Sequence, residues 1–287
     1  MSQVSTGIVF RPQSPPEQLR EVVEAADAAA GVDELWLWED CFLEGGLTTA
    51  ALALAWSTRL RVGIGLLPVP LRNVALTAME LATLERMFPG RLVPGVGHGV
   101  QAWMAQVGAR PASPLTLLRE YAVALRALLA GETVTTSGRY VQLDGVALDW
   151  PPSPPPPLML GGAGPKSVDL AAELGEGNLL ACALTDAEVA DASARVTAAR
   201  GLGHPLVATE IVATGPGARQ RVDAELPRWG KEPGTSGTAG DAATVADAVR
   251  RLAGLGVTTL VFQPTEDEPD LEGLVRFLGR DVAPLLG

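Results

Sequence analysis

Short β-rich segments alternate with helical patterns along almost the whole chain, and this order restricts the fold more than any other feature of the sequence. Between the segments, apolar residues recur at helical spacing, as in Leu118, Tyr121, Leu125 and Leu128. Strands that alternate with helices form βαβ units with parallel strands. We predict eight strands, at Gly7–Phe10, Glu34–Trp38, Leu60–Leu67, Arg91–Gly97, Pro157–Gly161, Gly177–Ala181, Pro205–Ala213 and Val257–Gln263.

A parallel sheet of this kind either stays open or closes into a barrel. An open doubly wound sheet usually carries a glycine fingerprint after its first strand. Here the first strand runs into Arg11-Pro12-Gln13-Ser14-Pro15-Pro16 instead. Eight βα units in 287 residues fit a (βα)8 barrel of about 250 residues plus insertions. We therefore predict an α/β fold, a TIM barrel in which residues 1–287 form a single domain.

Two long connections predict insertions after the fourth and seventh strands. The first covers about residues 100–157 and holds a helix, a hairpin from Thr133 to Leu148 and a proline-rich segment, Pro151–Pro157. So many prolines cannot join a sheet, and we expect a stiff polyproline spacer that leads into the fifth strand. The second, Trp229–Gly240, is polar and glycine-rich, as expected of a loop near the barrel mouth.

Charge and cysteine content exclude several classes of partner. The net charge is −11, and Lys166 and Lys231 are the only lysines, so the surface should repel nucleic acid and anionic membranes. The cysteines and histidines do not have the spacing of metal ligands, and we predict no metal site. With no signal-peptide pattern and no long uncharged apolar run, we expect a cytoplasmic protein.

The carboxyl ends of barrel strands carry the functional residues of such folds. Glu39 and Asp40 follow the second strand, and a close pair of carboxylates there can serve as acid or base. His98 follows the fourth strand within Gly97-His98-Gly99, where an imidazole can hydrogen-bond a ring or take a proton. The alternatives are a solvated loop for the carboxylates and a structural role for the histidine. We interpret Trp36, Trp38 and Trp103 as core or rim packing.

A glycine-rich segment, Gly161-Gly162-Ala163-Gly164-Pro165-Lys166, follows the fifth strand and leads into a helix. Pro165 stands where a P-loop needs glycine, so we reject a nucleoside triphosphatase. Free amides at a helix N-terminus still attract phosphate, and Lys166 adds a positive charge. This segment is our candidate phosphate site, with a tight turn bearing a solvated lysine as the alternative.

Three segments together resemble the luciferase-like monooxygenase superfamily of flavin-dependent oxidoreductases, and within it the branch that uses the deazaflavin coenzyme F420. The strongest match is RVGIGLLPVPLRNVALTAMELATLERMFPGRLVPGVGHGVQAWMAQVGA. The second is PLMLGGAGPKSVDLAAELGEGNLL, and the third is LREYAVALRALLAGETVTTSGRY.

The resemblance implies a barrel that is often a homodimer, with the flavin or deazaflavin ring at the mouth and its phosphate near strands five and six. It implies a non-prolyl cis peptide behind the ring, which falls here at Gly65–Leu66. The cofactor-binding residues that it implies, together with the glycines and histidine above, are Gly65, Leu66, Gly97, His98, Gly99, Gly161, Gly162, Ala163, Gly164 and Lys166.

Two departures from the family pattern limit what can be carried over. The family usually has Asp-His after strand two, whereas this chain has Glu39-Asp40-Cys41. One alignment sets Glu39-Asp40 against the Asp-His pair, and the other sets Asp40-Cys41 against it. The sugar-phosphate dehydrogenase relatives have a glutamate where this chain has Val100, which argues against that class of substrate.

We therefore predict an oxidoreductase that transfers a hydride between coenzyme F420 and a small organic substrate. Glu39, Asp40 or His98 would hydrogen-bond the ring edge or relay the proton, and the two insertions would exclude water. The alternatives are an FMN-dependent monooxygenase of the same family and a non-catalytic barrel that binds a flavin or deazaflavin.

Overall fold

Eight parallel strands close into a barrel in the computed structural model, which describes residues 4–287. All eight predicted strands are confirmed, with ends within about two residues of the prediction. The last strand of the barrel pairs back onto the first, which closes the sheet. In their order around the barrel the strands are β1 (Ser5–Phe10), β2 (Glu34–Leu37), β3 (Arg61–Pro68), β4 (Leu92–Gly97), β7 (Met159–Gly161), β8 (Gly177–Cys182), β9 (Leu206–Ala213) and β11 (Thr259–Pro264).

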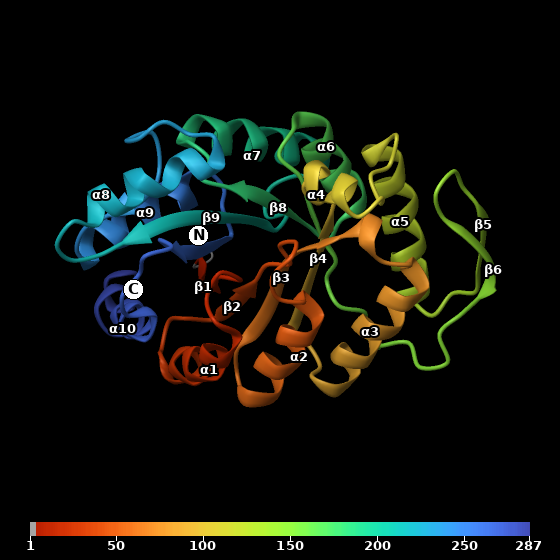
Figure 1. Cartoon of the computed structure of the whole chain (residues 1–287), viewed down its shortest axis with the longest axis horizontal. Coiled ribbons are helices and arrows are strands. Elements are labelled where there is room, and N and C mark those ends of the chain that lie inside the picture. The colour runs from red at the N-terminus through yellow and green to blue at the C-terminus, as the bar shows by residue number, and fades with distance from the viewer. Residues whose placement is uncertain (1–3) are drawn as a thin grey trace.

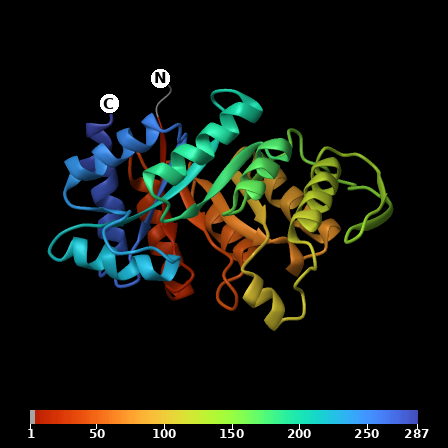
Figure 2. The ribbon, with the colours of Figure 1, turned by 90° about the horizontal axis from the view of Figure 1, so that it is seen from above.

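Helices surround the barrel, as Figures 1 and 2 show. Each buries one face against the strands, as α1 does with Leu19, Val22, Val23 and Ala26. Polar side chains fix several helix starts, and Asn73 accepts a hydrogen bond from the Ala75 amide at the start of α3. The barrel helices are α1 (Leu19–Ala28), α2 (Gly46–Trp56), α3 (Val74–Met87), α5 (Pro114–Leu129), α6 (Pro165–Leu174), α7 (Asp186–Arg200), α9 (Ala242–Gly254) and α10 (Leu271–Phe277).

The barrel interior is packed with side chains around Trp36. Gly63 on the neighbouring strand makes room for this ring, because a Cβ at Gly63 would lie 2.3 Å from the indole. Trp36 is therefore core packing, as predicted. The interior cluster consists of Val9, Trp36, Val93, Met159, Leu179, Val207 and Val261.

The first insertion divides into two parts that lie in different places. Helix α4 (Gln101–Gln106) precedes α5, and the predicted hairpin, β5 (Val134–Ser137) with β6 (Gln142–Val146), follows it. Glu120 on α5 accepts hydrogen bonds from three backbone amides near the hairpin turn, at Arg139, Tyr140 and Val141. Figures 1 and 2 show the hairpin at the outer edge of the molecule. The expectation that the whole insertion excludes water from the mouth is therefore wrong for the hairpin.

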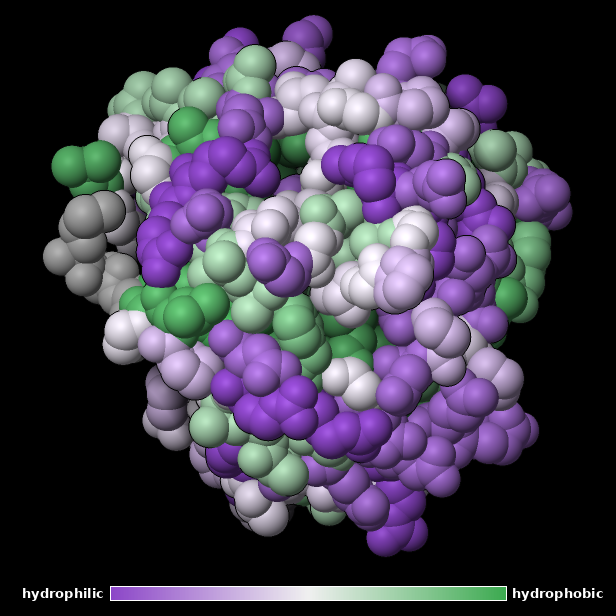
Figure 3. Space-filling model, turned by 90° about the vertical axis from the view of Figure 1, so that its left-hand side faces the viewer, coloured by the Kyte–Doolittle hydropathy of each residue, from purple (hydrophilic) through white to green (hydrophobic). Residues whose placement is uncertain are grey.

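The second insertion precedes α9. The predicted loop, Trp229–Gly240, contains β10 (Thr238–Ala239), which pairs with β9, and the connection from β9 also holds α8 (Ala218–Glu225) and a short 3-10 helix that ends at Trp229. The face of the molecule nearest α8 and α10 is largely hydrophilic in Figure 3, in keeping with the high net charge. Within residues 4–287, every helix is too short or too polar to cross a bilayer.

Glu210 on β9 gives a testable link between burial and pH. Its side chain is 5% exposed and accepts hydrogen bonds from Thr238 Oγ1 at 2.6 Å and from Arg251 Nη2 at 3.2 Å. Burial raises the pKa of Glu210 from 4.5 to about 7. Because this pKa is higher in the folded than in the unfolded chain, stability should fall as pH rises from about 4.5 through 7.

Glu210→Gln should remove that loss. Relative to the unchanged protein, the variant should gain on the order of 3 kcal/mol in free energy of unfolding between pH 5 and pH 8. Urea unfolding at the two pH values measures the difference. The exposed Asp247→Asn serves as the control, and the same pH dependence in Glu210→Gln as in the unchanged protein would contradict the assignment.

Candidate active site

A cavity of about 720 Å³ opens at the carboxyl ends of strands β2, β3, β4, β7, β8 and β9. This volume lies within the range of small-molecule and cofactor sites, roughly 300–1,000 Å³. Ten of the predicted site residues line it: Glu39, Asp40, Gly65, Leu66, His98, Gly99, Gly161, Gly162, Ala163 and Gly164. Gly97 and Lys166 do not line it.

A backbone bulge forms one wall of the cavity. The peptide bond between Gly65 and Leu66 is cis, as the resemblance implied, and the pairing of β3 with β4 shifts register at this point. A Cβ at Gly97 would lie 2.5 Å from Leu66 Cδ2, and one at Gly161 would lie 2.7 Å from the same atom. The missing side chains of these two glycines thus leave room for the Leu66 side chain of the bulge.

Gly97→Val should therefore displace the bulge. The new Cβ would also lie 2.7 Å from the Gly161 carbonyl oxygen, a backbone atom that cannot rotate away. We expect the variant to lose roughly 1–3 kcal/mol of stability through overpacking and to bind cofactor poorly. Thermal unfolding and a cofactor titration measure the two effects. Gly254→Ala, whose Cβ meets nothing within 4 Å, is the matched control, and normal cofactor affinity in Gly97→Val would contradict the packing argument.

Glu39 is held in place by its neighbours. Its carboxylate accepts from the Gly46 amide at 2.7 Å and from Arg72 Nη2 at 2.8 Å, and Arg72 also pairs with Glu80. The carboxylate oxygens of Glu39 are therefore largely occupied by Arg72 and by the Gly46 amide at the start of α2. Of the two adjacent carboxylates, Asp40 remains available to the cavity.

Asp40 lies at the cavity rim, partly buried. Burial raises the pKa of its carboxyl, while a hydrogen bond from Gln13 and the charge of Arg11 lower it in part. Cys41, the next residue, does not line the cavity, so the structure favours Asp40 over Cys41 at this position.

His98 is positioned by a hydrogen bond across the cavity wall. Its Nε2 lies 2.9 Å from Ser167 Oγ on α6, and its Nδ1 is buried without a well-aligned hydrogen-bond partner among the described residues. A Cβ at Gly162 would lie 2.4 Å from Ser167 Cβ, so this glycine makes room for the contact. Burial lowers the pKa of His98 below 6.5, which favours a neutral imidazole at neutral pH.

The candidate phosphate loop reaches the cavity, but its lysine does not. Helix α6 begins at Pro165 after Gly164, and no side chain caps its first amides. Pro165 has no N–H, and the Ser167 and Val168 amides donate to the Gly164 carbonyl, so the backbone amides of Gly162–Gly164 and of Lys166 are the donors that suit an anion here. Lys166 is exposed outside the cavity, because the helical turn carries it away from the loop.

Three tryptophans line the cavity beyond those positions. Trp38, which follows β2, and Trp229 of the second insertion have ring centroids 5.4 Å apart and planes at 85°. Trp103 lines the cavity as well, so the interpretation of Trp38 and Trp103 as packing alone was incomplete. The sequence signal that could have found Trp38 was its position directly after a strand, at the end of the barrel that carries functional residues. Cys182, Thr209 and Ser167 were also missed as lining residues.

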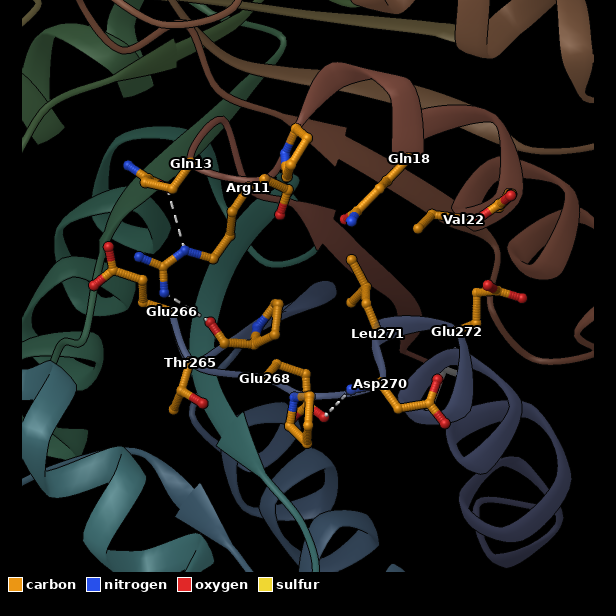
Figure 4. Close-up of a pocket in the computed structure, with 15 residues that line it drawn as sticks. Arg11, Gln13, Gln18, Val22, Thr265, Glu266, Glu268, Asp270, Leu271 and Glu272 are labelled. Atoms are coloured by element: carbon orange, nitrogen blue, oxygen red, sulfur yellow. Dashed lines mark hydrogen bonds between the residues drawn. The ribbon is translucent and has the colours of Figure 1, made fainter.

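A smaller cavity of about 340 Å³ lies between the segments that follow β1 and β11 (Figure 4). Arg11 extends along its inner side, where Nε donates to Gln13 Oε1 at 3.3 Å and Nη1 to the Pro264 carbonyl at 3.0 Å. Arg11 Nη1 also lies 2.9 Å from Glu225 Oε1, and both side chains are almost fully buried. This ion pair ties α8 to the barrel.

The fold and the site define a TIM barrel with a cofactor-sized cavity beside a cis bulge. The family model described as luciferase-like monooxygenase matches residues 3–229, and the chain belongs to this family.

Relatives and solved structures agree with that assignment. The chain is 31% identical over 175 residues to a 5,10-methylenetetrahydromethanopterin reductase of Methanolobus tindarius, a match that covers 61% of the chain and 53% of the relative. It is 30% identical over 183 residues to an F420-dependent glucose-6-phosphate dehydrogenase of Mycobacterium avium, covering 58% and 53%. The chain thus spans about half the length of the curated relatives it matches. The structure of a coenzyme F420 dependent tetrahydromethanopterin reductase from Methanopyrus kandleri has the same fold, with a TM-score of 0.86, 20% identity and full coverage of both chains.

Proposed function

We propose that this protein transfers a hydride between coenzyme F420 and a small organic substrate. The observation that carries the proposal is the shape of the large cavity, which has the Gly65–Leu66 bulge on one wall and the Gly162–Gly164 loop that precedes α6 at its end. A planar ring and a phosphate would each find a suited surface there. The deazaflavin, when bound, supplies the carbon that gives or accepts the hydride.

The residues present fit such a cofactor. Leu66 would back the ring, and the loop Gly162–Gly164 with Ser167 would bind the phosphate. A Cβ at Gly164 would meet nothing within 4 Å, so there is open space beside this loop. Lys166 would contribute only a distant charge.

Two side chains serve the chemistry in this proposal. The neutral His98, oriented by Ser167, would take up or return the proton that accompanies the hydride. Asp40 would face the substrate, with Glu39 fixing the loop through Arg72. Trp38, Trp103 and Trp229 would exclude water and hold the substrate close to the ring.

The family as a whole includes flavin enzymes, so the cofactor could be F420 or FMN. Relatives named as F420-dependent favour F420. Titration of the purified protein with F420, and separately with FMN, tests the choice through quenching of cofactor fluorescence. Tight F420 binding with weak FMN binding is the expected result. Preference for FMN would replace the proposal with a monooxygenase, and binding of neither would leave a non-catalytic barrel.

The partner we propose for the chain, besides its substrate, is a second copy. Exposed apolar side chains gather on α2 and α3, where Leu52 is 41%, Leu76 47%, Met79 57% and Met87 65% exposed. Burying such a surface against itself would stabilise a dimer. Light scattering measures the oligomer, and a monomer at micromolar concentration would contradict this part of the proposal.

A further inference from the structure

The charges around the large cavity are predominantly negative. Among the described residues that line it there is no lysine or arginine, and the ionisable side chains are Glu39, Asp40, His98 and Cys182, whose thiol is kept neutral because burial raises its pKa. Arg72 is engaged by two glutamates, and Arg11, behind Asp40, is paired with Glu225. An anionic substrate would find no free cation beside the ring site.

The tryptophan pair adds a surface that favours positive charge. Trp38 and Trp229 meet edge to face, with their planes at 85°, so the two rings form a corner in the cavity wall. The face of an indole ring is electron-rich and attracts a cation within about 6 Å. Compact cations are commonly recognised by aromatic faces combined with a carboxylate.

Asp40 supplies that carboxylate. It lies two residues after Trp38 on the same segment and lines the same cavity. Its other contacts are the neutral amide of Gln13 and the already paired Arg11. A cationic ligand would complete the charge balance of this side chain.

We propose that the substrate reduced in this site carries a positive charge, as an iminium ion does, and that Trp38, Trp229 and Asp40 recognise it. The inference rests on the hydride-transfer function proposed above. The hydride from the reduced deazaflavin adds to the carbon of the C=N⁺ bond, and the π electrons become the nitrogen lone pair. The iminium is thereby reduced to a neutral tertiary amine. The donor is oxidised, and the proton lost from it passes to His98.

This chemistry accounts for a departure from the family pattern. Reduction of a carbonyl requires a proton for the new oxygen, whereas reduction of an iminium requires none at the substrate. The histidine that the family usually has after strand two is replaced here by the Glu39-Asp40-Cys41 segment. A carboxylate at that position suits a counter-ion better than a proton donor.

Calorimetric titration of the cofactor-free protein tests the proposal with a pair of ligands of nearly equal shape. The probes are N-methyl-3,4-dihydroisoquinolinium and its uncharged analogue 3-methyl-1,2-dihydronaphthalene. We expect the cation to bind at least about tenfold more tightly. Asp40→Asn and Trp229→Leu should each weaken binding of the cation by roughly 5- to 20-fold and leave the neutral probe almost unchanged.

Two control variants and three contrary results complete the test. Asp247→Asn and Trp150→Leu remove an exposed carboxylate and an exposed tryptophan and should leave both affinities unchanged. Equal or tighter binding of the neutral probe by the unchanged protein would overturn the proposal, even if a variant failed to fold. Binding of F420 without preference for the cation would overturn this inference alone. Preference for the cation without binding of F420 would overturn the hydride-transfer function.

Discussion

His98→Ala should lower turnover with F420 by roughly 10²- to 10⁴-fold while the affinity for F420 stays largely unchanged. The imidazole lines the cavity, is held through Nε2 by Ser167 and is kept neutral because burial lowers its pKa, so it can accept a proton there. Steady-state kinetics and a fluorescence titration of the same variant separate the two effects.

The pH profile provides a second readout of His98. Its pKa is below 6.5, so the base form should persist as pH falls through 6.5, and activity should decline only below that value. Ser167→Ala is the informative comparison, because it removes the orienting hydrogen bond and keeps the imidazole. Unchanged turnover in His98→Ala would remove this residue from the mechanism.

Arg11→Met should reduce the free energy of unfolding by about 3–5 kcal/mol. The side chains of Arg11 and Glu225 are 6% and 4% exposed, so the substitution leaves a buried carboxylate without its counter-ion. Glu225 also accepts from the Glu266 amide at 3.1 Å, and the β11–α10 segment should loosen with it. Denaturant unfolding at pH 7 measures the loss.

The double variant Arg11→Met, Glu225→Met should recover much of that stability, because no unpaired charge remains buried. Arg250→Met breaks a pair in which both side chains are more than half exposed and should change stability by less than about 1 kcal/mol. Equal losses in the buried and exposed pairs would contradict the role assigned to burial.

Local patterns predicted the barrel well because each element is visible in a short stretch of sequence. Apolar runs such as Leu206–Ala213 are buried at every position, and a buried parallel strand looks the same wherever it lies in a barrel. The helix after Gly164 was equally visible, since Pro165 suits a first helical turn. The cis bond at Gly65–Leu66 came from the resemblance, not from these patterns.

The details of the site depended on contacts between distant parts of the chain. Nothing near Glu39 in the sequence indicates that Arg72 will occupy its carboxylate, and nothing near Trp229 indicates that it will meet Trp38. The resemblance implied Gly97 as a cofactor contact, whereas the structure shows the Leu66 side chain packed against this glycine. Lys166 carries the right charge and follows the right loop, but the structure leaves it exposed outside the cavity.

The position of the β5–β6 hairpin has a consequence for how such a scaffold can change. The hairpin packs along α5 at the outer edge, and its turn residue Tyr140 accepts a hydrogen bond from the amide of Ser113, which lines the cavity. Away from Tyr140, chain can be added or removed in the hairpin without disturbing the ring of strand ends. The six-residue α4, by contrast, sits directly beside the cavity. In the connection between β4 and β7, the hairpin can thus change in length, while changes in α4 affect which ligand the cavity accepts. An engineer could attach a tag or a second domain at the hairpin and reshape ligand preference at α4 independently.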